Sequence, residues 1–497
     1  MRKEKSFMFN LTLEQVRELS KDYNIIPLTI ETYADMDTPI SVFKRMQTER
    51  DCFLLESIGQ SQVTARYSFI GRNPFITFTS LGKDITVTDY TGKTESFTGK
   101  PMEELNKIIE KYKAPKLDNV PSFNGGAVGF FAYDIIRQYE DLPNMPKDEL
   151  KIPDMHFLLT DEIIAFDHTN QKIVIIVNIH AEGNIDNQYK KATLRLMDIY
   201  REMMDLSKLS QKSPRNYRDT HEVTSNVTKE EFCKNVEKAK EYIKNGDIFQ
   251  VVLSQRFTVT TSQDPLNVYR ALRLINPSPY MYYLNFGDYQ IVGASPEMLV
   301  RVENGIVQTG PIAGTRWRGK TLEEDLALEQ DLLNDKKEIA EHTMLVDLGR
   351  NDIGRVSEFG SVKVTRFKHI ERFSHVMHIV SDVEGKLRKD KNCFDALAST
   401  LPAGTLSGAP KIRAMEIIDE IENTKRCVYG GAIGYISFNG NFDSCITIRT
   451  GVFKDGKAYV QAGGGIVYDS VPEYEYNESV NKAASVLRAI EEAGDIV

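Results

Sequence analysis

Short runs of β-branched and aromatic residues, separated by turn residues, fill the chain from about residue 25 to residue 180. Runs of this length and composition are typical of strands. They read CFLLES, SFIGRNPFITFTS, DITVTDYTGK, GAVGFFAYD, EIIAFD and KIVIIVNI. Helical patterns do not alternate regularly with these runs. The pattern therefore favours an α+β fold over a doubly wound parallel sheet.

A polar segment divides the chain. A helix is predicted over 189–206, and the proline-containing segment 207–226 lacks periodicity and is predicted to be a linker. An amphipathic helix then begins after Thr228, which forms a capping-box pattern with Glu231. The sequence thus separates into 1–206, the linker 207–226 and 227–497.

Composition limits the function classes. The chain has 497 residues and a formal net charge of -9, which argues against nucleic acid or an anionic membrane as the main partner. Its five cysteines are scattered and form no C-x-x-C pair, as expected for reduced thiols rather than a disulfide framework or a zinc site. The N-terminus has no apolar signal-peptide core, and the longest apolar run has only strand length. We therefore expect a cytoplasmic protein.

Two predicted helices each carry a pair of glutamates three residues apart, Glu338 with Glu341 and Glu475 with Glu478. Asp335 fits the first helix's N-cap, and Glu338 alone is explained equally well as its capping-box partner. Glu341 is not, because like charges on one helix face repel by a few tenths of a kcal/mol, roughly. If the two faces converge, oxygen ligands without cysteine favour Mg²⁺ over zinc. The alternative is that both pairs are solvated.

Glycine clusters occur at 402–411, 429–435 and 461–470. The first lacks the spacing and the Ser or Thr of a P-loop, so nucleotide binding is rejected. Tight turns explain the glycines singly. The third cluster, however, leads into the second glutamate helix, where Pro472 fits the first position and Ser470 fits capping. Main-chain N–H groups there would suit a carboxylate.

Two charged or titratable residues lie in apolar surroundings. His378 occurs in a strand-like run, where a buried core histidine and a catalytic histidine are both consistent with the pattern. Arg449 is predicted to alternate with Ile446 and Ile448 on a strand. It is either a rim residue or an anion clamp.

Several long motifs in order resemble one family. They read ASPEMLV, GPIAGTRWRG, KKEIAEHTMLVDLGRND, VMHIVSDVEG, LPAGTLSGAPKIRAMEIID, YGGAIGYISFNGNFDSCITIRT and QAGGGIVYDSVPEYEYNES, spanning about 228–490. They resemble the chorismate-utilising enzymes, and among them those that aminate chorismate to anthranilate. The resemblance implies two large antiparallel sheets packed as a sandwich with helices outside. It also implies that 227–497 is the chorismate-binding catalytic region.

The resemblance further implies a Mg²⁺ site. Glu341 and Glu478 match the metal ligands, and Glu338 and Glu475 would support them directly or through water. Chorismate is a dicarboxylate, so four converging glutamates would repel it unless a divalent cation lies between them.

The same matching assigns roles to other residues. Glu297 would be the general acid and His378 the base, with Thr405 near the substrate. The remaining substrate-binding residues are Gln250, Tyr429, Arg449, Gly463, Gly464, Gly465 and Lys482.

Two positions distinguish family members. Water-adding relatives carry a lysine where this chain has Gln250, and para-aminating relatives carry a nucleophilic lysine where it has Ala313. Glutamine cannot act as a base, and alanine cannot form a covalent adduct. Isochorismate synthase and aminodeoxychorismate synthase are therefore the disfavoured alternatives. A non-catalytic sensor would lack the glutamates or His378.

No motif of a glutaminase nucleophile occurs, so a glutamine amidotransferase subunit is the implied source of ammonia. The N-terminal region 1–206 resembles a regulatory region that binds tryptophan as a feedback inhibitor. The matching residues are Glu56, Ser57, Pro279, Tyr280 and Met281. By composition alone, these residues would be ordinary strand and turn.

Overall fold

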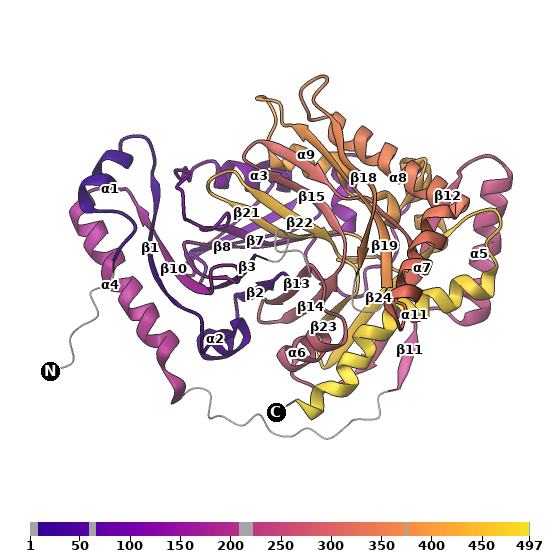
Figure 1. Ribbon diagram of the computed structural model, residues 1–497, viewed down its shortest axis with the longest axis horizontal. Helices are drawn as coiled ribbons and strands as arrows, with labels where there is room; N and C mark the ends of the chain where they lie inside the picture. The colour runs from indigo at the N-terminus through magenta and orange to yellow at the C-terminus, as the bar shows by residue number, and fades with distance from the viewer. Residues whose placement is uncertain (1–7, 59–65, 208–221, 373–375, 497) are drawn as a thin grey trace.

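The computed structural model describes residues 8–58, 66–207, 222–372 and 376–496. These residues form two antiparallel twelve-stranded sheets with helices outside (Figure 1). Side chains from both sheets, among them Phe53, Phe130, Ile291 and Ile433, meet in one buried cluster. The sandwich and the α+β class are therefore confirmed.

The first sheet contains strands from both halves of the chain. Its order is β1 (Ile25–Tyr33), β10 (Lys172–His180), β9 (Glu162–Asp167), β3 (Tyr67–Arg72), β2 (Cys52–Glu56), β13 (Tyr280–Asn285), β14 (Tyr289–Ser295), β23 (Thr450–Lys454), β24 (Lys457–Ile466), β12 (Gln250–Thr260) and β11 (Val223–Ser225), with β20 (Gly408–Ala409) on β12. The N-terminal half joins the C-terminal half where β2 pairs with β13, with Glu56 opposite Met281. Strand β11 lies inside the segment that was predicted to be a linker.

The second sheet is also shared. Its order is β17 (Ile312–Trp317), β19 (Val376–Lys386), β16 (Ile306–Thr309), β15 (Met298–Glu303), β22 (Phe442–Ile446), β21 (Ala432–Ser437), β7 (Gly126–Phe131), β8 (Met155–Thr160), β4 (Ile76–Leu81), β5 (Asp84–Asp89) and β6 (Thr94–Thr98), with β18 (Lys363–Arg372) on β19. The halves meet where β21 pairs with β7. The N-terminal and C-terminal regions thus share both sheets.

Helices cover the outer faces. They are α1 (Leu13–Leu19), α2 (Pro39–Met46), α3 (Pro101–Ile109), α4 (Ile185–Met204), α5 (Lys229–Lys244), α6 (Pro265–Ile275), α7 (Leu322–Asn334), α8 (Lys336–Gly354), α9 (Cys393–Thr400), α10 (Lys411–Ile421) and α11 (Pro472–Glu492), with 3-10 turns η1 (Tyr133–Gln138), η3 (Gly404–Leu406) and η4 (Ala493–Asp495). None of the helices in the described part of the chain is long and apolar enough to cross a membrane.

Helix caps explain most helix starts. Thr228 and Glu231 form the predicted capping box of α5. Helix α4 begins earlier than predicted because the Asn184 side chain accepts a hydrogen bond from the Asn187 N–H. At α11, Pro472 does occupy the first turn, but the cap residue is Val471 rather than Ser470. The Ser470 hydroxyl instead accepts from the Val467 N–H.

The first turn of α8 departs from one expectation. Asp335 is the N-cap, and its side chain accepts from the N–H groups of Lys337 and Glu338. Glu338 does not complete a capping box, because its side chain lies towards Gly314 of β17. The capping explanation for Glu338 is therefore wrong.

Candidate active site

The site lies where the chain twice crosses between the sheets. One crossing runs from β14 to β15 and carries Glu297, and the other runs from β22 to β23 and carries Arg449. The crossings are adjacent, because the Ile446 N–H donates to the Glu297 carbonyl over 3.0 Å. Arg449 is therefore not on a strand, as the alternation had predicted. The change of sheet requires a bend there, and Arg449 adopts a φ of 53°.

Glu297 has the properties of a general acid. Burial disfavours its carboxylate and raises its pKa to about 7. The Thr405 hydroxyl donates to Oε1 over 3.2 Å, and this bond, with the charges of Lys482 and Arg449, offsets part of the increase. A carboxyl group that is partly protonated near neutral pH is suited to donate a proton.

Arg449 lies among the other predicted substrate-binding residues. Burial lowers its pKa, while Tyr429, Glu478 and Glu297 raise it through their charges. The loop of Tyr429 is fixed to the second crossing, because the Gly430 N–H donates to the Thr447 carbonyl over 3.0 Å. The Arg449 backbone is held as well, because its carbonyl accepts from the Ala294 N–H over 3.1 Å. A buried guanidinium on a fixed backbone is suited to bind a carboxylate.

The third glycine cluster lies in strand β24 rather than in a turn. Gly463, Gly464 and Gly465 pair with β12. A Cβ at Gly463 would lie 2.2 Å from the Leu253 carbonyl oxygen, so only glycine permits this close approach. The Lys482 ammonium donates to the Gly463 carbonyl over 3.1 Å from the side away from β12. Because the N–H and C=O of one residue share an edge of an antiparallel strand, the Gly463 N–H also points to this side.

The distinguishing position Gln250 is the first residue of β12. Its Nε2 lies 2.5 Å from where a Cβ of Gly465 would be, so the side chain covers the glycine strand. The Gln250 side chain therefore lies against β24, the strand whose main-chain N–H groups are predicted to bind a carboxylate.

His378 is half-buried on β19 and faces the opposite side from the buried Met377 and Ile379. Its Nδ1 lies 2.9 Å from the Gly314 carbonyl oxygen. A carbonyl only accepts, so Nδ1 carries the proton and Nε2 is the basic nitrogen. Burial lowers the pKa of His378, which keeps the imidazole neutral and able to accept a proton.

The histidine's partner is a β-bulge. The pairing of β17 with β19 shifts between Ala313 and Thr315, and Gly314 adopts a φ of 73° there. This left-handed conformation favours glycine and turns the Gly314 carbonyl towards His378. Ala313, the second distinguishing position, is therefore next to the residue that orients the histidine.

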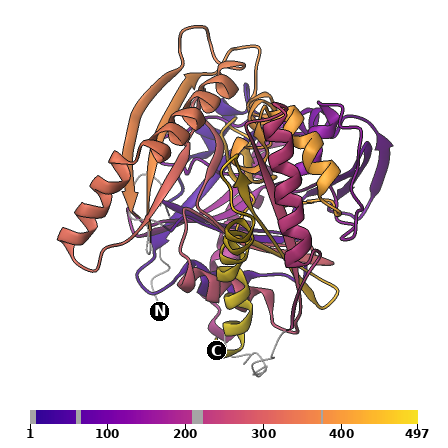
Figure 2. The ribbon, with the colours of Figure 1, turned by 90° about the vertical axis from the view of Figure 1, so that its right-hand side faces the viewer.

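The four glutamates form two pairs on different helices. A Cβ at Gly314 would lie 3.1 Å from Glu338 Oε2, which places the α8 pair beside the strand of His378. A Cβ at Gly464 would lie 3.2 Å from Glu475 Oε2, which places the α11 pair over the glycine strand. Figure 2 shows orange α8 against the orange strands, apart from yellow α11. In the described ranges, no group of three or more His, Cys, Asp or Glu side chains is arranged to hold a metal ion.

Each pair nevertheless fits a cation. Burial raises the pKa of Glu338, and the nearby charges of Glu341 and Asp335 raise it further. Burial also raises the pKa of Glu475, and Glu478 adds to it. Glu475 Oε2 is buried and has no hydrogen-bond partner in the structure. Carboxylates destabilised in this way are candidates for Mg²⁺ ligands.

Lys482 partly neutralises the α11 pair. Its Nζ lies 2.5 Å from Glu478 Oε1 in the next turn of the helix. The same ammonium contacts Gly463, so Lys482 links the glutamates to the glycine strand. The predicted contact of Lys482 with the substrate is compatible with this position, and the ammonium also pairs with Glu478.

The residues predicted to bind an inhibitor line a cavity of about 530 Å³ between the sheets, and Pro296 and Met298, on either side of Glu297, line the same cavity. They are Glu56, Ser57, Pro279, Tyr280 and Met281. The Glu56 carboxylate accepts from the Tyr269 hydroxyl over 2.5 Å and from Arg273 Nε over 3.2 Å. The Glu56 side chain is buried, with 4% exposure. Because Tyr269 and Arg273 both belong to α6, this helix already holds the carboxylate.

Arg301 and Asp443 are among the charged residues of this cavity that the sequence reasoning missed. Arg301 Nε donates to Asp443 Oδ2 over 3.0 Å, and the Tyr280 hydroxyl donates to Asp443 Oδ1 over 2.9 Å. Each is a charge between apolar residues of a strand, Val300 and Val302 for Arg301 and Phe442 and Cys445 for Asp443, which is the signal that could have identified them.

Comparison with known proteins identifies the family of the chain. The model of the chorismate binding enzymes matches residues 50–488. The anthranilate synthase component 1 of Acetivibrio thermocellus is 61% identical over 493 residues, covering 98% of this chain and 100% of the relative. That of Aquifex aeolicus (strain VF5) is 48% identical, covering 97% of this chain and 98% of the relative.

Solved structures agree as well. The crystal structure of anthranilate synthase component I from Streptococcus pneumoniae TIGR4 has a TM-score of 0.75 and 41% identity, covering 91% of this chain and 98% of that one. The menaquinone-specific isochorismate synthase of Escherichia coli, at 18% identity and a TM-score of 0.71, covers 96% of this chain and 98% of its own and shares the fold.

The chain therefore belongs to the chorismate-binding enzymes. Within this class of catalysts, its family is that of anthranilate synthase component 1.

Proposed function

We propose that this protein converts chorismate and ammonia to anthranilate, pyruvate and water. The observation that carries the proposal is the arrangement of an acid, Glu297, and a base, His378, whose charges both interact with Arg449. Full-length relatives named anthranilate synthase component 1 support the same reaction.

The proposed steps use residues of this chain. Arg449 and the Gly463 N–H bind a substrate carboxylate, and Glu297 donates a proton to the hydroxyl that leaves C4 as ammonia forms the bond to C2. His378 Nε2 then takes the proton from C2, and the ring becomes aromatic as the C3–O bond breaks. The enolpyruvate that leaves takes up a proton at its methylene carbon and becomes pyruvate. Gln250 and Ala313 supply neither a base nor an amine nucleophile, which favours ortho-amination by ammonia over both alternatives.

Glu341 and Glu478, supported by Glu338 and Glu475, would hold Mg²⁺. When bound, this ion would neutralise the glutamates and attract the ring carboxylate of chorismate. The buried, unbonded Glu475 Oε2 supports the assignment.

Three further proposals concern the source of ammonia, the inhibitor and the location of the protein. A glutamine amidotransferase subunit supplies the ammonia, which agrees with the "component 1" in the names of the relatives. Tryptophan inhibits by binding in the cavity of Ser57 and Tyr280. A cytoplasmic location fits the five cysteines, all of which are free thiols.

The test is to incubate the pure protein with chorismate, Mg²⁺ and ammonium, and to follow anthranilate fluorescence. We expect anthranilate from ammonium and none from glutamine until the amidotransferase subunit is added. Isochorismate or para-aminated product would instead support one of the alternatives. Turnover of glutamine by the chain alone would contradict the proposed partner.

A further inference from the structure

A buried ion pair lies beneath the predicted substrate site. Glu422 ends α10, and Arg426 follows four residues later, in the segment that leads to Tyr429. Arg426 Nε donates to Glu422 Oε2 over 2.8 Å, and Nη2 donates to Oε1 over 2.6 Å. Arg426 is 3% exposed, so the pair is shielded from solvent.

Arg426 also connects the segments that carry site residues. Its Nη1 donates to the Leu406 carbonyl over 2.6 Å, directly after Thr405. Its Nη2 donates to the Val252 carbonyl over 2.7 Å, two residues after Gln250. The guanidinium carbon lies 5.6 Å from the centre of the Tyr429 ring.

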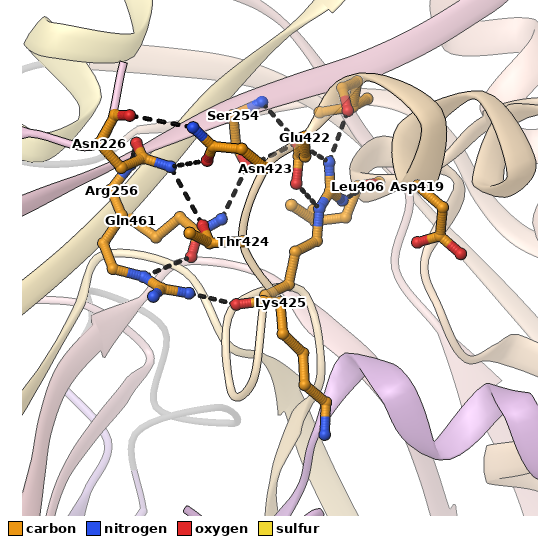
Figure 3. Close-up of polar contacts among 12 residues, drawn as sticks. Asn226, Ser254, Arg256, Leu406, Asp419, Glu422, Asn423, Thr424, Lys425 and Gln461 are labelled. Carbon is orange, nitrogen blue, oxygen red and sulfur yellow. Dashed lines mark hydrogen bonds and ion pairs between the residues drawn. The ribbon is translucent and has the colours of Figure 1, made fainter. Parts of the chain in front are cut away.

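Glu422 strengthens the same junction. Its Oε1 accepts from both the N–H and the hydroxyl of Ser254, each over 2.8 Å. In Figure 3, Glu422 lies between Ser254 of β12 and Leu406 of η3. The two residues therefore join a strand, a turn and a loop that are distant in sequence.

The rest of the segment is bonded just as extensively. Asn226 Nδ2 donates to Asn423 and Thr424 over 2.8 and 3.0 Å. Lys425 Nζ donates to Asp154 Oδ1 over 2.6 Å. Figure 3 shows the contacts of Asn226 with Asn423 and Thr424 beside Glu422. These contacts hold residues 422–425 in place, and the Arg426 side chain extends from this segment to the predicted active site.

We infer that Glu422 and Arg426 are positioning residues that set the relative placement of Gln250, Thr405 and Tyr429 around chorismate. The inference rests on the proposed function. Neither residue is among those that contact the substrate in the proposed site. A buried pair is a weak source of stability, because apolar replacements of similar volume are often neutral or better. Its geometric value is larger: a planar guanidinium holds the carboxylate and two carbonyls at once, which the single ammonium of lysine cannot do.

The chain offers a matched control. Arg137 donates through Nη2 to both oxygens of Asp419, each over 2.7 Å, and Asp419 precedes Glu422 on the same helix. Arg137 Nη1 also donates to two carbonyls, those of Leu142 and Asn144, over 3.3 and 2.8 Å. Neither carbonyl lies in a segment that contains a predicted active-site residue. A purely structural role predicts the same behaviour for both arginines.

The experiment compares Arg426→Lys, Glu422→Gln and the control Arg137→Lys for Tm, kcat, KM and chorismate affinity by equilibrium dialysis. We expect a fall in kcat/KM of about 100-fold for Arg426→Lys, the usual effect of a displacement of about 1 Å. KM should rise and kcat should fall. Glu422→Gln keeps the side-chain shape and should also raise KM and lower kcat, by smaller factors. It tests the inference even if Arg426→Lys does not fold. Arg137→Lys should lower Tm while kcat and KM stay at the parent values.

Kinetics of Arg426→Lys and Glu422→Gln that match Arg137→Lys would overturn the inference. If the parent binds chorismate but makes no anthranilate, the proposed function fails, and the inference is decided by the affinity of the variants. Unchanged affinity in that case would overturn it as well.

Discussion

Two cavities in the molecule differ in their size and in the elements that line them. The cavity of Ser57 and Tyr280 encloses about 530 Å³, whereas the cavity beside Glu297 and Thr405 encloses about 50 Å³. The two cavities adjoin, because Met298 and Gly310 line both. Ser57 and Tyr280 line the large cavity, where we propose tryptophan binds, and Glu297 and Thr405 line the small one.

Strands β2 and β13 supply one wall of the large cavity. The predicted reaction site combines the two crossings and helices α8 and α11 with strand residues such as Gln250, His378 and Gly463.

Strand register controls the geometry of these two regions to different degrees. Pairing of Glu56 with Met281 sets the walls of the large cavity directly, because a one-residue slip would turn every side chain to the other face. The reaction site depends instead on how α8 and α11 pack on their own strands, β17 and β19 for α8 and β24 for α11. Changes to the reaction site should thus leave the large cavity intact, and the reverse should also hold.

The largest expected effect is loss of turnover from the glutamate pairs. Glu341→Gln or Glu478→Gln removes a proposed ligand charge and should lower kcat/KM by at least about 10³-fold. Excess chelator should do the same to the parent. Tryptophan affinity, measured by calorimetry, should not change. The control is Glu491→Gln at the exposed end of α11. Full activity in either variant would remove the argument for magnesium.

The next effect concerns the acid. The Glu297 pKa is raised from 4.5 to about 7, so the protonated form dominates below pH 7 and is lost above it. At a constant concentration of free ammonia, kcat/KM for chorismate should therefore fall about tenfold per pH unit above this pKa. Glu297→Gln should lower the rate by about 10²-fold and flatten this limb. An unchanged limb in the variant would assign the titration to another group.

The base should be separable from the acid. His378→Met keeps bulk but removes the titratable ring, so amination should survive better than loss of pyruvate. We expect release of 2-amino-2-deoxyisochorismate, detected by chromatography, and a fall in anthranilate formation of about 10²-fold. The control is His180→Met on β10 of the other sheet. Anthranilate at the parent rate would make His378 a structural histidine.

Local sequence patterns predicted the strands and helices well. They predicted poorly the contacts between segments that are distant in sequence, such as the places where the chain changes from one sheet to the other. Strand runs and the Thr228 cap need only neighbours in sequence, and both are confirmed. Arg449 was misplaced because a change of sheet depends on contacts between distant segments. Glu338 was ambiguous for the same reason: the residue it faces, Gly314, lies on another element. The pairing of Glu422 with Arg426 resembles an ordinary solvated charge run in the sequence, and only burial distinguishes it.

The smallest effect on catalysis should come from Ser57→Phe, which tests the independence of the large cavity. Ser57 and Tyr280 line this cavity, and the Tyr280 hydroxyl is fixed by Asp443. A phenyl ring at position 57 would occupy space that we assign to tryptophan.

The inhibition constant of tryptophan should therefore rise at least about tenfold, which corresponds to about 1.4 kcal/mol of lost binding. Meanwhile kcat and KM for chorismate should stay at the parent values, because Ser57 is neither a predicted reaction-site residue nor part of the lining of the small cavity. Ser96→Phe on the exposed strand β6 is the control and should remain inhibited. Steady-state rates against tryptophan concentration measure both quantities. If Ser57→Phe stays fully inhibited, tryptophan does not use this cavity. If the variant loses turnover together with inhibition, the two regions are not independent, and strand register at β2 and β13 also supports the chemistry.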